Sequence, residues 1–324
     1  MSTTNNEKNN WLEQRKTGIG GSDVSAVLGL SPFRSPLDVY LEKTHQAEQQ
    51  PENDAMYWGT KLEELVAKKY SEETGLEVRK VNSILRSKDF PMLIGNIDRA
   101  VCVEKGKLPV VKGEFRTNKI LECKTARSQT QDWGNAGTDE VPEYYLTQCL
   151  HYLGLTGCQT CDLAVLFLES RKFQIYTIQA DTDFITRLQN HLAFWWEKHV
   201  VKNVPPAPRS FEDVQKLFKK SVAITKTATD EIEYFASQFA ELKRMRTNID
   251  EKMNTLKDTI ATYLGDADTL VNVSGTPLIT WKTGKDKTTT DWQSLAISLG
   301  ATETQIQAHT KTTNGNRTFL CKIK

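Results

Sequence analysis

The sequence predicts an α/β (α+β) fold in which helices flank a central mixed sheet and a mostly helical tail follows. Upstream of residue 203, short β-rich runs alternate with helical apolar periodicities, which is typical of such a sheet. The Pro-rich segment 204–210 can neither continue a helix nor join a sheet interior. Beyond it, apolar residues recur in steps of three and four. We therefore expect one domain over 1–203, a linker over 204–210, and a helical, coiled-coil region with a small β element over 211–324.

The composition is compatible with this division. A chain of 324 residues that is 38% hydrophobic can form one large core plus an appendage. Its 42 basic and 41 acidic residues give a net charge of +1, so any contact with a polyanion must come from local patches. The first ten residues lack the apolar stretch of a signal peptide, and no run of about 18 apolar residues follows. We expect a soluble, cytoplasmic protein that does not associate with membranes.

The cysteines give little evidence of a metal or redox centre. Of the six, only Cys158 and Cys161 have C-x-x-C spacing, and no second pair accompanies them. Reduced structural thiols are the favoured interpretation, and whether this pair binds anything is left open.

The individual elements follow from the local patterns. The predicted helices cover residues 23–28, 36–43, 56–74, 144–155 and 183–202. The predicted strands cover residues 90–103, 119–123, 162–168 and 173–178, and a polar turn at 169–171 joins the last two.

The tail carries the longest periodic pattern. Ten positions between Ile232 and Tyr263 alternate in steps of three and four, and all but Arg246 are apolar. This predicts a coiled coil or a long helical hairpin. Three roles of this segment remain open: an intramolecular hairpin, an oligomer contact and a docking site for a partner protein. Arg246, at a core position, is the residue that should distinguish these roles. A strand pair around 271–281 and a short helix near 292–299 should follow.

The strand predicted at 119–123 is followed directly by a lysine, so an acid and a base stand two residues apart. Glu122 and Lys124 should project from the same face, because side chains alternate along a strand. Asp98 follows the apolar run 92–97 and would adjoin them if the two strands pair. Two neighbouring carboxylates repel each other unless a cation lies between them. By itself, the spacing is also compatible with a solvent-facing salt bridge.

Magnesium would suit this constellation, and manganese is the alternative. Magnesium prefers oxygen ligands, and it can polarise a phosphodiester and activate water. Lys124 would then orient or deprotonate the attacking water, or stabilise charge at phosphorus. Glu63 shares a helix edge with Val66 and Tyr70, so it is the acid of this helix expected to point inward as a third ligand. An ordinary surface glutamate is the alternative.

Two further features could contact phosphate. The Gly20-Gly21-Ser22 turn leads into a helix, where backbone N–H groups can bind an anion, and Arg15 could add donors. A plain helix cap is the alternative. Residues 104–127 carry four more basic than acidic side chains and could form a phosphate-facing or merely solvated loop.

Together these segments resemble the YqaJ-like viral recombinase family, which is related to the lambda-type alkaline exonuclease within the PD-(D/E)XK nucleases. The most specific resemblance is the run W-L-E-Q-R-K-T-G-I-G-G-S-D at 11–23 with L-G-L-S-P-F at 28–33. The segments W-G at 58–59, G-N-I-D at 95–98, L-E-C-K at 121–124 and Y-L-T-Q at 145–148 follow in the family order.

The resemblance implies a restriction-endonuclease-like fold and assigns roles to residues. Asp98, Glu122 and Glu63 would bind metal, Lys124 would assist the nucleophilic water, and Gln148 would complete the catalytic set. Arg15 and Ser22 would contact the terminal phosphate. It further implies a phage or prophage protein of the bacterial cytoplasm that digests duplex DNA from 5′ ends for a single-strand annealing partner. Some relatives form trimeric rings.

Three departures qualify these implications. The segment G-N-I-D lacks the nominal proline, Val101 to Lys119 is long for a hairpin, and Leu150 stands where some relatives have a second glutamine. An endonuclease of the same fold and a catalytically inactive DNA-binding or assembly protein are the alternative functions.

Overall fold

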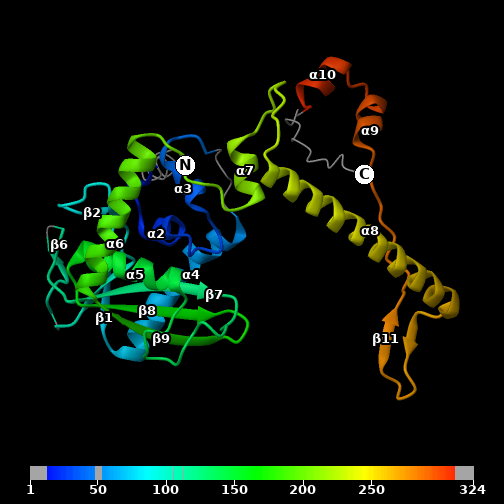
Figure 1. Cartoon of the computed structure of the whole chain (residues 1–324). Helices are drawn as coiled ribbons and strands as arrows, with labels where there is room; N and C mark the ends of the chain where they lie inside the picture. The colour runs from blue at the N-terminus through cyan, green and yellow to red at the C-terminus, as the bar shows by residue number, and fades with distance from the viewer. Residues whose placement is uncertain (1–12, 48–52, 105, 112, 311–324) are drawn as a thin grey trace. The chain divides into compact units, whose positions relative to one another are not determined.

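A central five-stranded sheet organises the N-terminal part of the computed structural model, which describes residues 13–47, 53–104, 106–111 and 113–310 (Figure 1). The strand order is β1-β4-β7-β8-β9. The β7–β8 pair is parallel and the other neighbours are antiparallel, so the sheet is mixed. These strands are β1 (Glu77–Lys80), β4 (Arg99–Cys102), β7 (Lys119–Ala126), β8 (Thr160–Phe167) and β9 (Lys172–Gln179).

Helices flank this sheet, and the predicted fold class is confirmed. The helices of this part are α2 (Gly21–Leu28), α3 (Pro36–Lys43), α4 (Asp54–Thr74), α5 (Glu143–Thr156), α6 (Thr182–Trp195) with its π-helical continuation Trp196–Val201, and α7 (Phe211–Leu217). Serine and asparagine N-caps begin α3 and α4. Glycines in the left-handed conformation end α2, α4 and α5.

One cluster of buried apolar residues lies between α4 and the sheet. Val66, Ala67 and Tyr70 of α4 pack against apolar residues of β4, β7 and β8. Leu121 and Cys123 are the members from β7, so this strand turns its odd-numbered side chains toward α4. Its even-numbered side chains, including Glu122, therefore face the opposite side, where α5 supplies Gln148.

One predicted strand is wrong in its extent. Residues 90–103 do not form a single strand, because Ile94–Gly95 (β3) pairs with Leu85–Arg86 (β2) in a separate two-stranded sheet. The chain joins the central sheet only at Arg99. Asp98 therefore lies immediately before β4, in the bend between the two sheets, and not inside a strand. His151 of α5 contacts the carbonyl of Ile94 at 2.8 Å, which ties this bend to the helix.

Two further differences concern strands that the pattern did not reveal. The strand β1 is a mostly exposed edge strand, so no apolar alternation marks it. The long connection after β4 contains a small hairpin, formed by β5 (Val110–Val111) and β6 (Glu114–Phe115).

The chain divides into two compact units, Met1–Lys216 and Leu217–Lys324. Most of α7 belongs to the first unit, because Lys216 forms a 2.7 Å ion pair with Asp38 and Ser35 donates to Asp213. In the second unit, α8 (Asp230–Leu264) is one continuous helix of 35 residues. The predicted alternative of a helical hairpin within this segment is therefore wrong. The predicted strand pair is present as β10 (Thr269–Val271) and β11 (Pro277–Thr280), followed by α9 (Trp292–Ser298) and α10 (Glu303–Ala308).

Among the described residues, no helix is both long enough and apolar enough to cross a membrane. The five described cysteines are free thiols, and Cys158 and Cys161 are both buried. Cys321 and Trp11 lie outside the described residues.

Candidate active site

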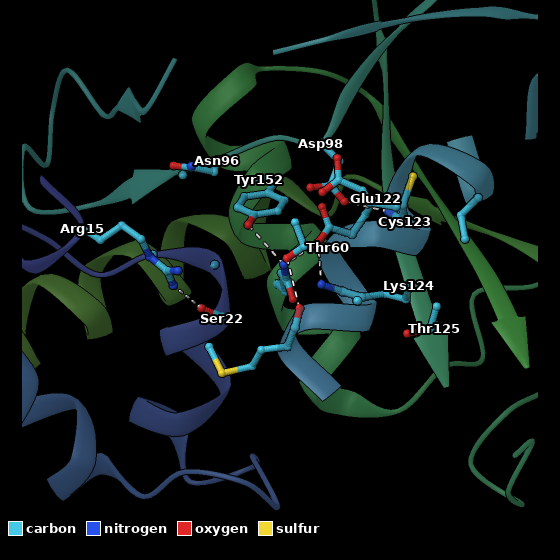
Figure 2. Close-up of a pocket in the computed structure, with 18 of the residues that line it drawn as sticks. Arg15, Ser22, Thr60, Asn96, Asp98, Glu122, Cys123, Lys124, Thr125 and Tyr152 are labelled. Carbon is cyan, nitrogen blue, oxygen red and sulfur yellow. Dashed lines mark hydrogen bonds and ion pairs between the residues drawn. The ribbon is translucent and has the colours of Figure 1, made fainter. Parts of the chain in front are cut away.

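One pocket collects the predicted site residues. Its volume is about 350 Å³, and it lies where α2, α4, α5, β7 and the bend before β4 meet (Figure 2). All seven residues singled out in the sequence line it: Arg15, Ser22, Glu63, Asp98, Glu122, Lys124 and Gln148. Figure 2 shows Asp98, Glu122 and Lys124 on one side and Arg15 with Ser22 on the other.

Glu122 is the most deeply buried acid of this pocket, with 2% of its surface exposed. Its Oε1 accepts hydrogen bonds from Gln148 Nε2 at 2.6 Å and from Lys124 Nζ at 2.7 Å. Gln148 Nε2 also lies 3.1 Å from the Tyr152 hydroxyl, one turn further along α5. Glu122 Oε2 is buried and has no hydrogen-bond partner among the described residues. A buried carboxylate oxygen without a partner is costly, so this atom is suited to receive a cation.

Asp98 lies beside Glu122. Extending the β4–β7 register from Arg99↔Leu121 places Asp98 opposite Glu122. Asp98 Oδ2 accepts a 2.9 Å hydrogen bond from the backbone N–H of Cys123, which fixes the carboxylate against β7. The predicted pairing of the two acids through neighbouring strand segments thus holds, although Asp98 precedes its strand.

Both acids resist ionisation, chiefly because they are shielded from water. Burial and the charge of Asp98 raise the pKa of Glu122 to about 8. Burial also raises the pKa of Asp98, and Glu63 adds to this effect. Burial alone would lower the pKa of Lys124, but the charges of Glu122 and Asp98 raise it above its usual value. Lys124 is therefore a fixed positive charge, which makes it a poor proton acceptor.

Glu63 lines the pocket but has another partner. Its Oε1 lies 2.6 Å from Arg99 Nη1, and Arg99 Nη2 binds Glu64 at 2.7 Å. Arg99 is almost fully buried and also donates to the Asp98 carbonyl at 2.8 Å. Glu63 thus connects α4 to the start of β4.

Within the described ranges, no three His, Cys, Asp or Glu side chains converge as a metal site would require.

The donor set nevertheless fits a hard divalent ion. Magnesium is often held by only one or two protein carboxylates and keeps several waters. Glu122 Oε2 and the Asp98 carboxylate meet this requirement without Glu63.

On the opposite side, Arg15 Nη2 donates to the Ser22 hydroxyl at 2.9 Å. A buried network holds this side in place. Asp23 Oδ2 accepts from the Gly20 N–H at 2.9 Å and from Lys43 Nζ at 2.7 Å, and Lys43 donates to the Arg15 carbonyl at 3.0 Å. Although burial opposes its ionisation, Lys43 and Arg34 hold the pKa of Asp23 well below its usual value.

Sequence reasoning missed the role of Arg99, which the arginine directly after Asp98 in an apolar run could have indicated. It also overestimated the basic segment 104–127. Within its described residues, Lys107, Arg116, Lys119 and Arg127 form ion pairs with Glu104, Glu114, Asp162 and Glu169, respectively. Lys124 is the one basic side chain of this segment that lines the pocket. Lys105 and Lys112 lie outside the described residues.

The sequence places this fold and pocket in a known class. Residues 10–159 match the YqaJ-like viral recombinase domain, so the chain carries a domain of that family and the resemblance is confirmed. The protein YqaJ of Bacillus subtilis (strain 168) is 32% identical over 222 residues, which cover 67% of this chain and 64% of that protein. A protein of Acanthamoeba polyphaga mimivirus is 26% identical over 156 residues, which cover 47% of this chain and 27% of that protein. The chain thus spans less than two thirds of either relative.

Similar solved structures include an alkaline exonuclease from Laribacter hongkongensis, which is 18% identical with a TM-score of 0.46. That similarity covers 60% of this chain and 93% of the other. A phage related exonuclease from Haemophilus somnus 129PT is 14% identical with a TM-score of 0.38, covering 60% of this chain and 100% of the other.

Two pocket glycines should respond oppositely to substitution. A Cβ at Gly21 would lie 2.4 Å from the Tyr152 ring, whereas a Cβ at Gly59 would meet nothing within 4 Å. We expect Gly21→Ala to lower the free energy of unfolding by about 1–3 kcal/mol through overpacking. Gly59→Ala, inside α4, should raise it by about 0.5–1 kcal/mol, because alanine is the better helix former. Urea unfolding measures both, and equal effects of the two variants would contradict the close packing of Gly21 on Tyr152.

Proposed function

We propose that the chain is a divalent-metal-dependent nuclease that digests double-stranded DNA from its 5′ ends and leaves 3′ single strands for an annealing protein. The observation that carries this proposal is the pairing of Asp98 with the buried Glu122, with Lys124 Nζ 2.7 Å from Glu122. The family match supports a role in viral recombination. The polarity of digestion, the annealing partner and a trimeric ring derive from the resemblance alone.

Magnesium is the proposed cofactor, with manganese as the alternative, and Glu122 Oε2 and Asp98 would hold it. When bound, the ion supplies Lewis-acid polarisation of the scissile phosphate and lowers the pKa of water. A bound cation would also offset the charge of Asp98 that helps to raise the pKa of Glu122.

The remaining residues would position the reactants. Lys124 stays protonated beside Glu122, so it would orient the attacking water or stabilise negative charge at phosphorus, and would not accept a proton. Gln148, which also donates to the Tyr152 hydroxyl, and Lys124 would keep Glu122 Oε1 occupied, and Oε2 would then be left for the ion. Of the three roles considered for Lys124 from the sequence, the raised pKa favours the two that need a charged ammonium.

Arg15 and Ser22 would bind the terminal phosphate of the DNA. Their side chains already contact each other and stand across the pocket from the two acids (Figure 2). The backbone at 20–22 starts a helix, whose N–H groups and dipole favour an anion. A site that holds a chain end in this way favours an exonuclease over an endonuclease.

The activity is tested with linear duplex DNA labelled at either end, closed circular duplex, and magnesium or EDTA. We expect metal-dependent loss of linear DNA from 5′ ends while closed circles survive. Asp98→Ala should reduce the rate by at least about a thousandfold, as expected when a metal-binding site is lost. Glu64→Gln is the matched control, because Glu64 is exposed and should leave the rate near that of the parent chain. Cutting of closed circles would instead indicate an endonuclease, and binding without cleavage would indicate a DNA-binding or assembly protein.

The phosphate contact predicts a dependence on end chemistry. Arg15→Gln should lower the ratio of rates on 5′-phosphorylated and 5′-hydroxyl ends by about tenfold or more, since a hydrogen bond between charged groups contributes roughly 1.5–3 kcal/mol. Single-turnover digestion of the two substrates measures the ratio. A variant that slows both substrates equally would show that Arg15 does not read the terminal phosphate. Arg127→Gln, at an exposed ion pair outside the pocket, serves as the control.

Metal affinity should depend on pH. Below a pKa of about 8 the ion must displace the proton of Glu122, whereas above it the carboxylate is already free. The apparent affinity for magnesium should therefore rise as pH increases toward about 8 and then level off. Calorimetric titration in two buffers of different ionisation enthalpy should detect proton release at pH values below the pKa. An affinity that does not change with pH would argue against Glu122 as a ligand.

A further inference from the structure

We propose that α8 pairs with α8 of a second copy of the chain as an antiparallel two-stranded coiled coil. This inference concerns the second unit and does not depend on the nuclease activity. It assigns one binding partner and one orientation to the ten-position apolar pattern between Ile232 and Tyr263, which we call the apolar stripe of α8.

The stripe is exposed along the described helix. Leu242, Ile249, Met253 and Leu256 are 57% to 63% exposed, although all four belong to the apolar pattern. A regular seven-residue repeat of apolar positions is the pattern that two helices bury against each other in a coiled coil. A partner helix with the same repeat would cover all four side chains.

The spacing of the apolar positions in α8 is the same when the helix is followed from either end. In an antiparallel pair, the first apolar position of each repeat packs against the second of the partner. Centring the pair between residues 247 and 248 places Leu242 against Met253 of the second copy and Arg246 against Ile249 of the second copy. The same register continues outward to Ile232 against Tyr263 of the second copy. The whole pattern is therefore used without an offset or an overhang.

The distribution of charge favours this orientation. Residues 230–242 contain four acidic and no basic side chains, whereas residues 243–264 contain five basic and three acidic ones. An antiparallel pair lays the acidic half of each helix along the net-basic half of the other. A parallel pair would place like-charged halves side by side, and like charges at close range are destabilising.

Individual positions support the same choice. Antiparallel pairing sets Lys243 beside Asp250 of the second copy, and symmetry repeats this attraction. Parallel pairing would instead stack Arg246 on Arg246 of the second copy at the core. It would also place Lys252 beside Lys257 of the second copy, which is a like-charge contact between flanking positions. Arg246 thus opposes the parallel arrangement.

The test uses the full chain of 36.7 kDa, with mass measured by light scattering over a range of concentrations. We expect assemblies with an even number of chains, the smallest of them at twice the chain mass, and Leu256→Asn should raise the dissociation constant of the α8 pair by at least about tenfold because it removes two buried apolar side chains. Thr255→Asn, on the outer face of the same helix, is the matched control and should leave the constant unchanged. A monomer at all concentrations, or an oligomer that Leu256→Asn does not weaken, would overturn the proposal.

Orientation is tested by charge reversal. Lys243→Glu and Asp250→Lys should each raise the dissociation constant by about tenfold, since each turns two attractions into repulsions. The double variant should restore the parent value to within about twofold, because exchanging the two charges leaves opposite charges facing each other at both contacts. Arg244→Glu changes the net charge equally on the outer face and should have little effect. Circular dichroism verifies that every variant keeps its helix. Single effects without rescue in the double variant would rule out the antiparallel register.

Discussion

The burial of Glu122 is the constraint on which the arrangement of the pocket depends. Leu121 and Cys123 must face α4 to complete the core, so the alternation of β7 forces Glu122 to the other side, away from water. An uncompensated buried carboxylate costs several kcal/mol. Lys124 and Gln148 offset part of this cost through Oε1, which requires α5 to lie across the end of β7. The position of Tyr152 on that helix in turn leaves room only for a glycine at residue 21.

A second buried charge fixes the opposite side of the pocket. Asp23 is fully buried but keeps its negative charge, because Lys43 and Arg34 contact it directly. Lys43 also holds the backbone of Arg15, so the Arg15–Ser22 pair is preorganised before any ligand arrives. The basic guanidinium of Arg15 is thereby kept across the pocket from the acids, as Figure 2 shows.

The sequence predicted most of the elements because their signals are local. Helix caps, apolar periodicity and the alternation of β7 determine where the first-unit helices begin and end and which face carries Glu122 and Lys124. The errors arose where distant contacts decide the structure. The run 90–103 has the composition of one strand, yet contacts with β2 and α5 divide it before Asp98. The edge strand β1 buries little apolar surface, so it has no periodic signal. Whether the tail helix folds back on itself depends on turn residues, and 230–264 contains no Gly or Pro.

Glu63 shows why residue roles are harder to predict than residue positions. Its place on the inward edge of α4 follows from periodicity, and it does line the pocket. Its partner, however, is Arg99. Arg99 lies opposite Leu121 in the β4–β7 pair, so its side chain is on the face of the sheet that α4 covers. A buried guanidinium left without an acid would be strongly destabilising, and Glu63 and Glu64 each supply Arg99 with a carboxylate. The contact connects the first half of α4 to the start of β4, although Met56, Trp58 and Leu65 on that half are largely exposed. Glu63 therefore links α4 to the start of β4 at the wall of the pocket, a contact that the periodicity of α4 alone does not predict.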